Sequence, residues 1–250
     1  MKDIVADYLR NYKGMLPDLY NWALDEKILL DRFGIDVSKS SSTLDKNVLL
    51  KKELTRIVQD NGTKENKIKI ANYIIKDWGG IRRFGRGEEI VTSFEEVEFT
   101  ETMPGLHYYF KGISSWSKYL GIIAPRWACI YDARVAYSLN VINYISGSRY
   151  PIFPGPSGRN SKITLLDIET LLIAAKIQEL DTYSPREIKR KQYINEDEVY
   201  RTYINLIHEL HGELWEPTDP IQYTEMLLFA IADNYVYKDL LKFCIKDEYI

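Results

Sequence analysis

Apolar residues that recur every three or four positions are the feature that most constrains the fold of this chain. The recurrence matches the 3.6-residue turn of a helix, so each such segment is predicted to be an amphipathic helix that buries one face. Only over 89–101 does the pattern leave helix and short strand equally open. The sequence therefore predicts an all-α fold, with helices over 3–12, 17–33, 44–58, 64–78, 133–145, 164–180, 195–214 and 220–245.

Composition adds bounds on domain number and partners. A chain of 250 residues with 45% hydrophobic and 28% charged residues is ordinary for one globular domain. We expect a single domain over 1–250, with two helical lobes around a central cleft. The net charge of -3 excludes a globally basic surface but allows a local basic patch. Without a signal peptide or a membrane-spanning apolar run, we expect a cytoplasmic monomer with no membrane partner.

The stretch 110–139 concentrates residues that can carry chemistry. A turn of small residues, Gly112–Ser117, is followed by Lys118 on a short apolar helix, and Asp132 opens the next helix after a loop. Backbone N–H groups at such a turn bind phosphate regardless of base sequence. An aspartate at a helix start is also favoured on structural grounds, by about 0.3–1 kcal/mol. The stretch therefore allows a helix cap or a site that combines a lysine with a carboxylate.

This arrangement resembles the helix-hairpin-helix DNA glycosylases. In that family a glycine-rich hairpin precedes a helix with an early lysine, and a loop that often contains a proline, here Pro125, leads to an essential aspartate. The corresponding element of this chain spans about 106–145. The resemblance implies that Asp132 carries the essential carboxylate with Lys118 beside it. It further implies DNA-phosphate contacts from Arg134 and the hairpin residues Gly112, Ser114, Ser115, Trp116 and Ser117.

The chain departs from the family pattern in two respects. Serines and Trp116 stand where the family usually has glycines, and Lys118 precedes Asp132 by 14 residues, a few fewer than usual. The resemblance covers the 30 residues of 110–139, and the remaining helices are only compatible with the family. Within the family we expect the prokaryotic phage-defence group, which removes heavily modified cytosines, although no residue fixes that choice.

The chemistry of base excision suits these residue types. Cleavage of an N-glycosidic bond builds positive charge on the sugar, which the Asp132 carboxylate would stabilise, or it would activate water. The Lys118 amine could attack the same carbon instead, but only with a lowered pKa. Because Lys118 is out of the family register, we expect a monofunctional DNA N-glycosylase without a cofactor. Its expected substrate is double-stranded DNA, in particular a glucosylated or otherwise modified cytosine of phage DNA in antiviral defence.

A base must leave the helical stack before it can be excised, so the protein needs aromatic walls to receive it. We expect these walls from Trp78, Tyr131 and Tyr223, although each ring is also a good core residue. A basic loop with an aromatic residue at its centre is predicted to contact phosphates, with a merely solvated loop as an equal alternative; its arginines are Arg82, Arg83 and Arg86.

Other motifs are weaker, and two rival functions stay open. The three histidines do not combine with Cys129 or Cys244 at a metal-binding spacing, so no metal site is expected. Glu225 is predicted to cap the last helix, with a hydrogen bond to a base edge as the alternative. A non-catalytic helix-hairpin-helix DNA-binding protein would use Asp132 only as a cap, and an all-α interaction protein would only pack the stretch 110–139. Release of a base from DNA separates these functions.

Overall fold

A computed structural model describes residues 1–148, 150–157, 160–168, 170–171, 182–184, 187 and 191–246 of the chain. Over these residues the chain is mostly helical and forms no strand beyond a single bridge between Ile152 and Tyr193. The all-α prediction is therefore confirmed. The α-helices are α1 (Lys2–Arg10), α2 (Leu16–Leu19), α3 (Glu26–Phe33), α4 (Thr43–Asn61), α5 (Lys64–Asn72), α6 (Gly87–Ser93), α7 (Ile113–Ile123), α8 (Ala133–Ile145), α9 (Ser161–Leu165), α12 (Val199–Leu214), α13 (Gln222–Ile231) and α14 (Tyr237–Lys246).

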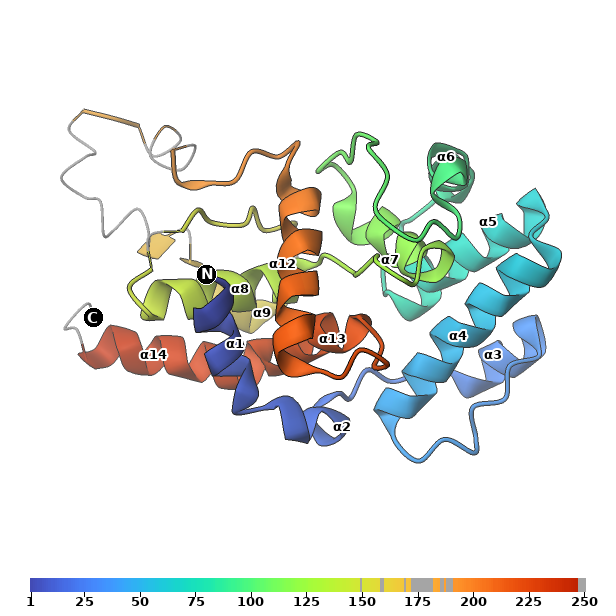
Figure 1. Cartoon of the computed structure of the whole chain (residues 1–250), viewed down its shortest axis with the longest axis horizontal. Coiled ribbons are helices and arrows are strands. Elements are labelled where there is room, and N and C mark those ends of the chain that lie inside the picture. Colours follow the sequence, from blue (N-terminus) through green and yellow to red (C-terminus); the bar gives the residue numbers. More distant parts are fainter. Residues whose placement is uncertain are drawn as a thin grey trace.

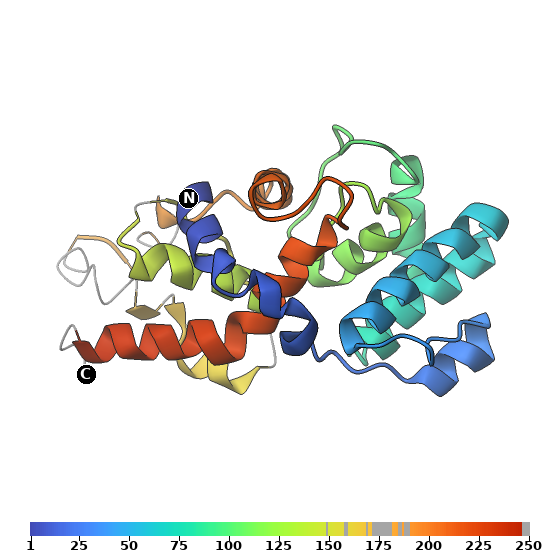
Figure 2. The same ribbon diagram turned by 60° about the horizontal axis from the view of Figure 1, so that its bottom comes forward.

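Two sets of helices each pack among themselves. One set is α4, α5, α6 and α7, and the other is α1, α8, α12, α13 and α14, while α2 contacts both α4 and α13. In Figure 1, α4 and α5 lie toward one end of the molecule and α14 toward the other. Figure 2 shows α4 and α5 side by side. Because α1 packs on α8 and α12, the N-terminal helix belongs with the C-terminal part of the chain.

The buried helices α7 and α8 come from different sets. Every residue of α7 from Trp116 to Ile123 is buried, and so is every residue of α8 from Val135 to Asn143. A helix that is buried on nearly all sides is normally apolar throughout. Lys118 of α7 breaks this rule, because it places an ionisable group inside the protein.

The single helix predicted over 17–33 is wrong, because α2 and α3 are separated by a non-helical segment, 20–25. Trp22 lies in this segment and donates its indole N–H to the carbonyl of Trp78 at 3.0 Å. The Trp22 carbonyl in turn accepts a hydrogen bond from the Asn47 side chain at 2.9 Å. These contacts with distant parts of the chain hold the segment out of the helical conformation that its apolar period favours.

The other helix predictions fare better. The prediction over 64–78 is confirmed by α5 and the π-helical turn η2 (Tyr73–Trp78), which continues it. The last predicted helix, over 220–245, is likewise formed by α13, the π-helical turn η5 (Ala232–Val236) and α14. The open region 89–101 contains part of α6 and the 3₁₀ turn η3 (Glu95–Val97). The helix predicted over 164–180 is not continuous, because α9 ends at Leu165 and residues 166–167 are not helical; residues 169 and 172–180 lie outside the described part.

The remaining elements are short turns, such as the 3₁₀ turn η1 (Lys13–Met15) before α2. None of the described helices is both long and apolar enough to span a membrane.

Candidate functional site

Asp132 is the N-cap of α8, and within the described part of the chain only one of its carboxylate oxygens accepts hydrogen bonds. Its backbone is extended, and its Oδ1 accepts hydrogen bonds from the backbone N–H groups of Arg134 and Val135, each at 3.0 Å. No described residue donates a hydrogen bond to the second oxygen, Oδ2. The cap therefore fixes the orientation of the carboxylate while one oxygen stays available to a ligand.

Lys118 is buried in α7, with 7% of its surface exposed. Its Nζ donates a hydrogen bond to the Ser114 carbonyl at 2.5 Å. Burial lowers the pKa of this amine, and the carboxylates of Asp132 and Glu225 oppose that effect. Space around the side chain is tight, since a Cβ added at Gly79 would lie 2.8 Å from Lys118 Cδ. Lys118 is thus held in one place with a reduced tendency to carry a proton.

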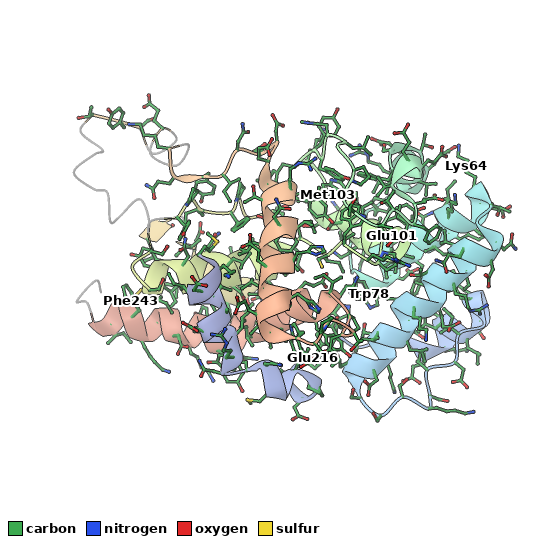
Figure 3. The ribbon with its side chains drawn as sticks, viewed as in Figure 1. Lys64, Trp78, Glu101, Met103, Glu216 and Phe243 are labelled. Carbon is green, nitrogen blue, oxygen red and sulfur yellow. The ribbon has the colours of Figure 1, made fainter. Side chains whose placement is uncertain are left out.

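Lys118 and Asp132 line the same small recess, although they stand on different elements. The recess has a volume of about 50 Å³, which is enough for water but not for a larger ligand. Its walls are mostly apolar, so charges inside it interact more strongly than they would in water. The remaining lining residues are Tyr20, Trp22, Trp78, Gly79, Ile130, Val135, Glu225 and Phe229. Figure 3 labels Trp78 between α4 and α13.

A larger groove adjoins the recess and shares Lys118 and Asp132 with it. Its volume of about 630 Å³ lies within the range typical of small-molecule sites, about 300–1,000 Å³. The first residues of α7 and of α8 both line it. Helix N-termini present backbone N–H groups and a positive dipole end, which favour anions such as phosphate. At α8 the Asp132 carboxylate already accepts these N–H groups, so the first turn of α7 is the end of the groove that favours an anion.

The predicted hairpin residues divide into two groups. Gly112 is the N-cap of α7 with a left-handed φ of 79°, and it lines the groove together with Ser114 and Ser115 in the first helical turn. Trp116 and Ser117 are instead buried. The Trp116 indole donates to a backbone carbonyl at 3.0 Å, and Ser117 Oγ accepts the N–H of the residue before Asp132 at 3.1 Å. Gly112 and the two serines therefore lie at the groove, whereas Ser117 holds α7 in the core and Trp116 forms part of the wall of an adjacent cavity.

The predicted arginines also divide. Arg134 lines the groove, forms an ion pair with Asp233 at 3.1 Å, and places its guanidinium carbon 4.5 Å from the ring centroid of Phe229. Arg83 and Arg86 line an adjacent cavity of about 420 Å³. This cavity shares residues with the groove, including Ile81, Lys111, Gly112 and Ser115. Arg86 also pairs with Glu89, and Arg82 is exposed beside the cavity without lining it.

Of the three aromatic residues predicted to receive a base, Trp78 alone lines the recess. Its indole N–H donates to Asn47 Oδ1 at 2.8 Å. Tyr131 is fully buried, and its hydroxyl donates a hydrogen bond to the Pro154 carbonyl at 2.6 Å. Tyr223 packs edge-on against Trp215. Neither tyrosine lines the recess or the groove.

The sequence did not single out the aromatic residues that share the recess with Trp78. These residues are Tyr20, Trp22 and Phe229, and Trp22 packs edge-on against both Trp78 and Phe229. Tyr20 and Trp22 were placed inside a continuous helix. The signal that could have corrected this is Asp25, a good N-cap residue that here accepts the Ile28 N–H at 3.0 Å and starts α3.

Glu225 does not cap the last helix as predicted. It is 4% exposed, and its carboxylate accepts the backbone N–H of Ile130 and pairs with Lys51. Burial raises its pKa, and the Lys51 ammonium opposes the shift. Glu225 is thus a third ionisable residue in the wall of the recess.

Searches against protein-family models, curated protein sequences and solved structures found no match to this chain. Among the described residues, no group of three or more histidine, cysteine, aspartate or glutamate side chains could hold a metal ion. Cys129 and Cys244 are buried free thiols. The residues of the recess and the groove are therefore the basis for inferring a function.

Proposed function

We propose that this protein is a DNA N-glycosylase that excises a base from double-stranded DNA. The observation that carries the proposal is the placement of Lys118 and Asp132 in one apolar recess, with Asp132 Oδ2 free of protein hydrogen bonds among the described residues. Glycosidic cleavage needs a carboxylate near the sugar carbon that becomes positive, in surroundings that exclude bulk water. A helix cap alone does not require a buried lysine beside it.

The adjoining groove supports DNA as the ligand. It joins the N-terminal ends of two helices from the two helix sets, which agrees with a cleft between two lobes. Lys111 and Arg83 are exposed along the groove and its neighbouring cavity, so they can contact successive phosphates. The recess of about 50 Å³ is too small for a base, and the groove of about 630 Å³ has room for one with a large substituent. A base with a large substituent, such as a modified cytosine, would therefore lie in the groove.

The surroundings of Lys118 favour one of the two groups, water or the lysine amine, that could attack the sugar. The sequence favoured water, because the register of Lys118 differs from that of the family. In the fold, however, Lys118 shares the recess with Asp132 and its pKa is lowered by burial, which is the condition for an amine nucleophile. We therefore infer that the Lys118 nitrogen bonds to the anomeric carbon as the bond from that carbon to the base breaks. The base leaves with the bonding electrons and takes up the proton that the attacking amine loses, while Asp132 stabilises the positive sugar.

The first test is release of bases from DNA, followed by mass spectrometry, for duplexes with different cytosine modifications. Asp132→Asn should lower the rate of base release by about 100-fold or more, since the charge that stabilises the sugar is lost. Asparagine caps helices as well as aspartate does, so the fold is retained. Asp25→Asn is the matched control, because Asp25 caps α3 in the same manner away from the recess. Equal rates for Asp132→Asn and the parent would refute the assigned role.

A second test identifies the nucleophile. Borohydride reduces the imine that forms between an amine and an abasic sugar, so the parent protein should become covalently attached to abasic DNA. Lys118→Met should form no such adduct. Base release without any adduct would assign the attack to water instead. DNA binding with no release from any duplex would favour the non-catalytic binding protein.

A further inference from the structure

A buried ion pair joins two distant helices at the wall of the recess. Lys51 of α4 and Glu225 of α13 approach to 3.5 Å between Nζ and Oε1, with side chains 10% and 5% exposed. Burying two charges costs desolvation that their attraction often fails to recover, so such a pair is weak evidence of a stabilising role. Its position next to Lys118 and Asp132 indicates a role in the site.

Glu225 holds the segment that carries Asp132. Its second oxygen, Oε2, accepts the backbone N–H of Ile130. The next N–H, from Tyr131, donates to Ser117 Oγ at 3.1 Å, and Ser117 immediately precedes Lys118. Two successive backbone groups before Asp132 are therefore fixed, one to α13 and one to α7. The distance between the carboxylate and the amine depends on both attachments.

Lys51 contacts both Glu225 and the ring of Trp78, and it faces a second cavity. Its Nζ lies 5.8 Å from the ring centroid of Trp78, which lines the recess with Glu225. Lys51 itself lines a different cavity of about 460 Å³, next to Thr55 and Gln222. The pair is thus a partition between this second cavity and the recess.

We propose that Lys51 and Glu225 form the positioning pair of the site, in which Glu225 holds Asp132 at its place beside Lys118 and the two charges set the reactivity of the Lys118 amine. The proposal rests on the proposed function for its effect on base excision. Its effect on the amine does not require DNA.

The two charges of the pair shift the pKa of Lys118 in opposite directions. Burial is the largest cause of the lowered pKa of Lys118; the Glu225 carboxylate opposes that lowering, whereas the Lys51 ammonium adds to it. Neutralising Glu225 should therefore lower the pKa of Lys118 further, and neutralising Lys51 should raise it. The ionisable residues that line the recess or the groove with Lys118, or belong to the pair, are Tyr20, Lys51, Lys111, Asp132, Arg134 and Glu225.

The first measurement is the pH dependence of Lys118 acetylation by acetic anhydride, followed by peptide mass spectrometry, because only the neutral amine reacts. We expect the midpoint to fall by about one pH unit in Glu225→Gln and to rise by a similar amount in Lys51→Met. Glu98→Gln is the control, since Glu98 pairs with Lys67 at 2.6 Å with both side chains 16% exposed, away from the recess. Unchanged midpoints in both site variants would overturn the proposal.

The second measurement is the rate of base release. Glu225→Met leaves Lys51 buried without its partner and can fail to fold, so the informative variant is the double replacement Lys51→Met with Glu225→Met. It removes both charges and the acceptor for the Ile130 N–H. We expect kcat to fall by about tenfold or more with KM nearly unchanged, because misplacement of a reacting group slows chemistry more than binding. Lys67→Met with Glu98→Met is the matched double control.

The outcomes separate the two proposals. A parent-like kcat in the Lys51 and Glu225 double variant would overturn the positioning role while the glycosylase stands. If the parent released no base from any duplex, the proposed function would fail, and the acetylation midpoints would still decide the role of the pair. A drop in kcat that is equal in the control double variant would also count against the positioning role.

Discussion

Replacement of Ser117 by alanine tests how the two halves of the site are joined. Ser117 lies on α7 next to Lys118, and its Oγ accepts the N–H of Tyr131 at 3.1 Å. Both residues are fully buried. Alanine removes the acceptor without creating a large cavity, so the Tyr131 N–H loses its partner where water cannot replace it.

The size of the effect follows from which group is left without a partner. An unsatisfied buried donor costs about 1–3 kcal/mol, so we expect Ser117→Ala to lower the free energy of unfolding by about 2 kcal/mol. For a chain of this length that corresponds to a fall in Tm of about 4–8 °C. Ser138→Ala is a matched control, since Ser138 is equally buried but donates, at 2.7 Å, to the carbonyl of Leu228 within α13. A carbonyl has a second lone pair, so this loss should cost only about 1 kcal/mol.

Thermal and urea unfolding of the three proteins measure the difference. Base release measured on the same samples should fall in Ser117→Ala and stay near the parent value in Ser138→Ala, because only Tyr131 adjoins Asp132. A Ser117→Ala protein that is as stable as Ser138→Ala would show that the Tyr131 N–H has another partner. The argument that this bond connects α7 to the Asp132 segment would then be refuted.

Two further predictions concern charge. Lys118→Met should raise the free energy of unfolding near pH 7, because the pKa of Lys118 is lower in the folded protein than in the unfolded chain, so folding weakens proton binding. The gain should shrink as the pH approaches the ordinary lysine pKa of 10.5. A loss of stability at neutral pH in thermal unfolding would contradict this reasoning. Arg83→Ala combined with Lys111→Ala should reduce the slope of log affinity for duplex DNA against log salt by about 1.8, since each lost phosphate contact removes about 0.9. Lys242→Ala, at an exposed side chain of α14, should leave that slope unchanged in the same titration.

The sequence predicted best the features that depend only on residues a few positions apart in the chain. The helical period depends on neighbours three and four residues away, so α4, α5 and α8 could be predicted with little error. The cap at Asp132 is local too, because a side-chain oxygen bonds the N–H groups two and three residues ahead. The helix predicted from the apolar period over 17–33 is wrong. Trp22 forms hydrogen bonds with residues 25 and 56 positions away, and these bonds keep the segment around it from forming a helix.

The candidate site was predictable only in part. The resemblance to the glycosylase family implied a site shared by Lys118 and Asp132, and the structure places both in one recess. Tyr131 and Tyr223 were assigned to the site from residue type alone, and such an assignment cannot tell a core ring from a lining ring. The aromatic wall instead combines Tyr20, Trp22 and Phe229 with Trp78, from segments far apart in the chain.

By itself, the sequence determined helices such as α4, α5 and α8, the break before α7 and the cap that orients Asp132, since each depends on residues within a turn or two. The tertiary structure alone decided that Lys118 and Glu225 would be buried together, with Lys51 beside them. Desolvation and the attraction between charges depend on every atom packed around a group, and those atoms come from α4, α7, α8 and α13 at once. The reactivity of the amine is therefore a property of the packed protein and not of any single segment.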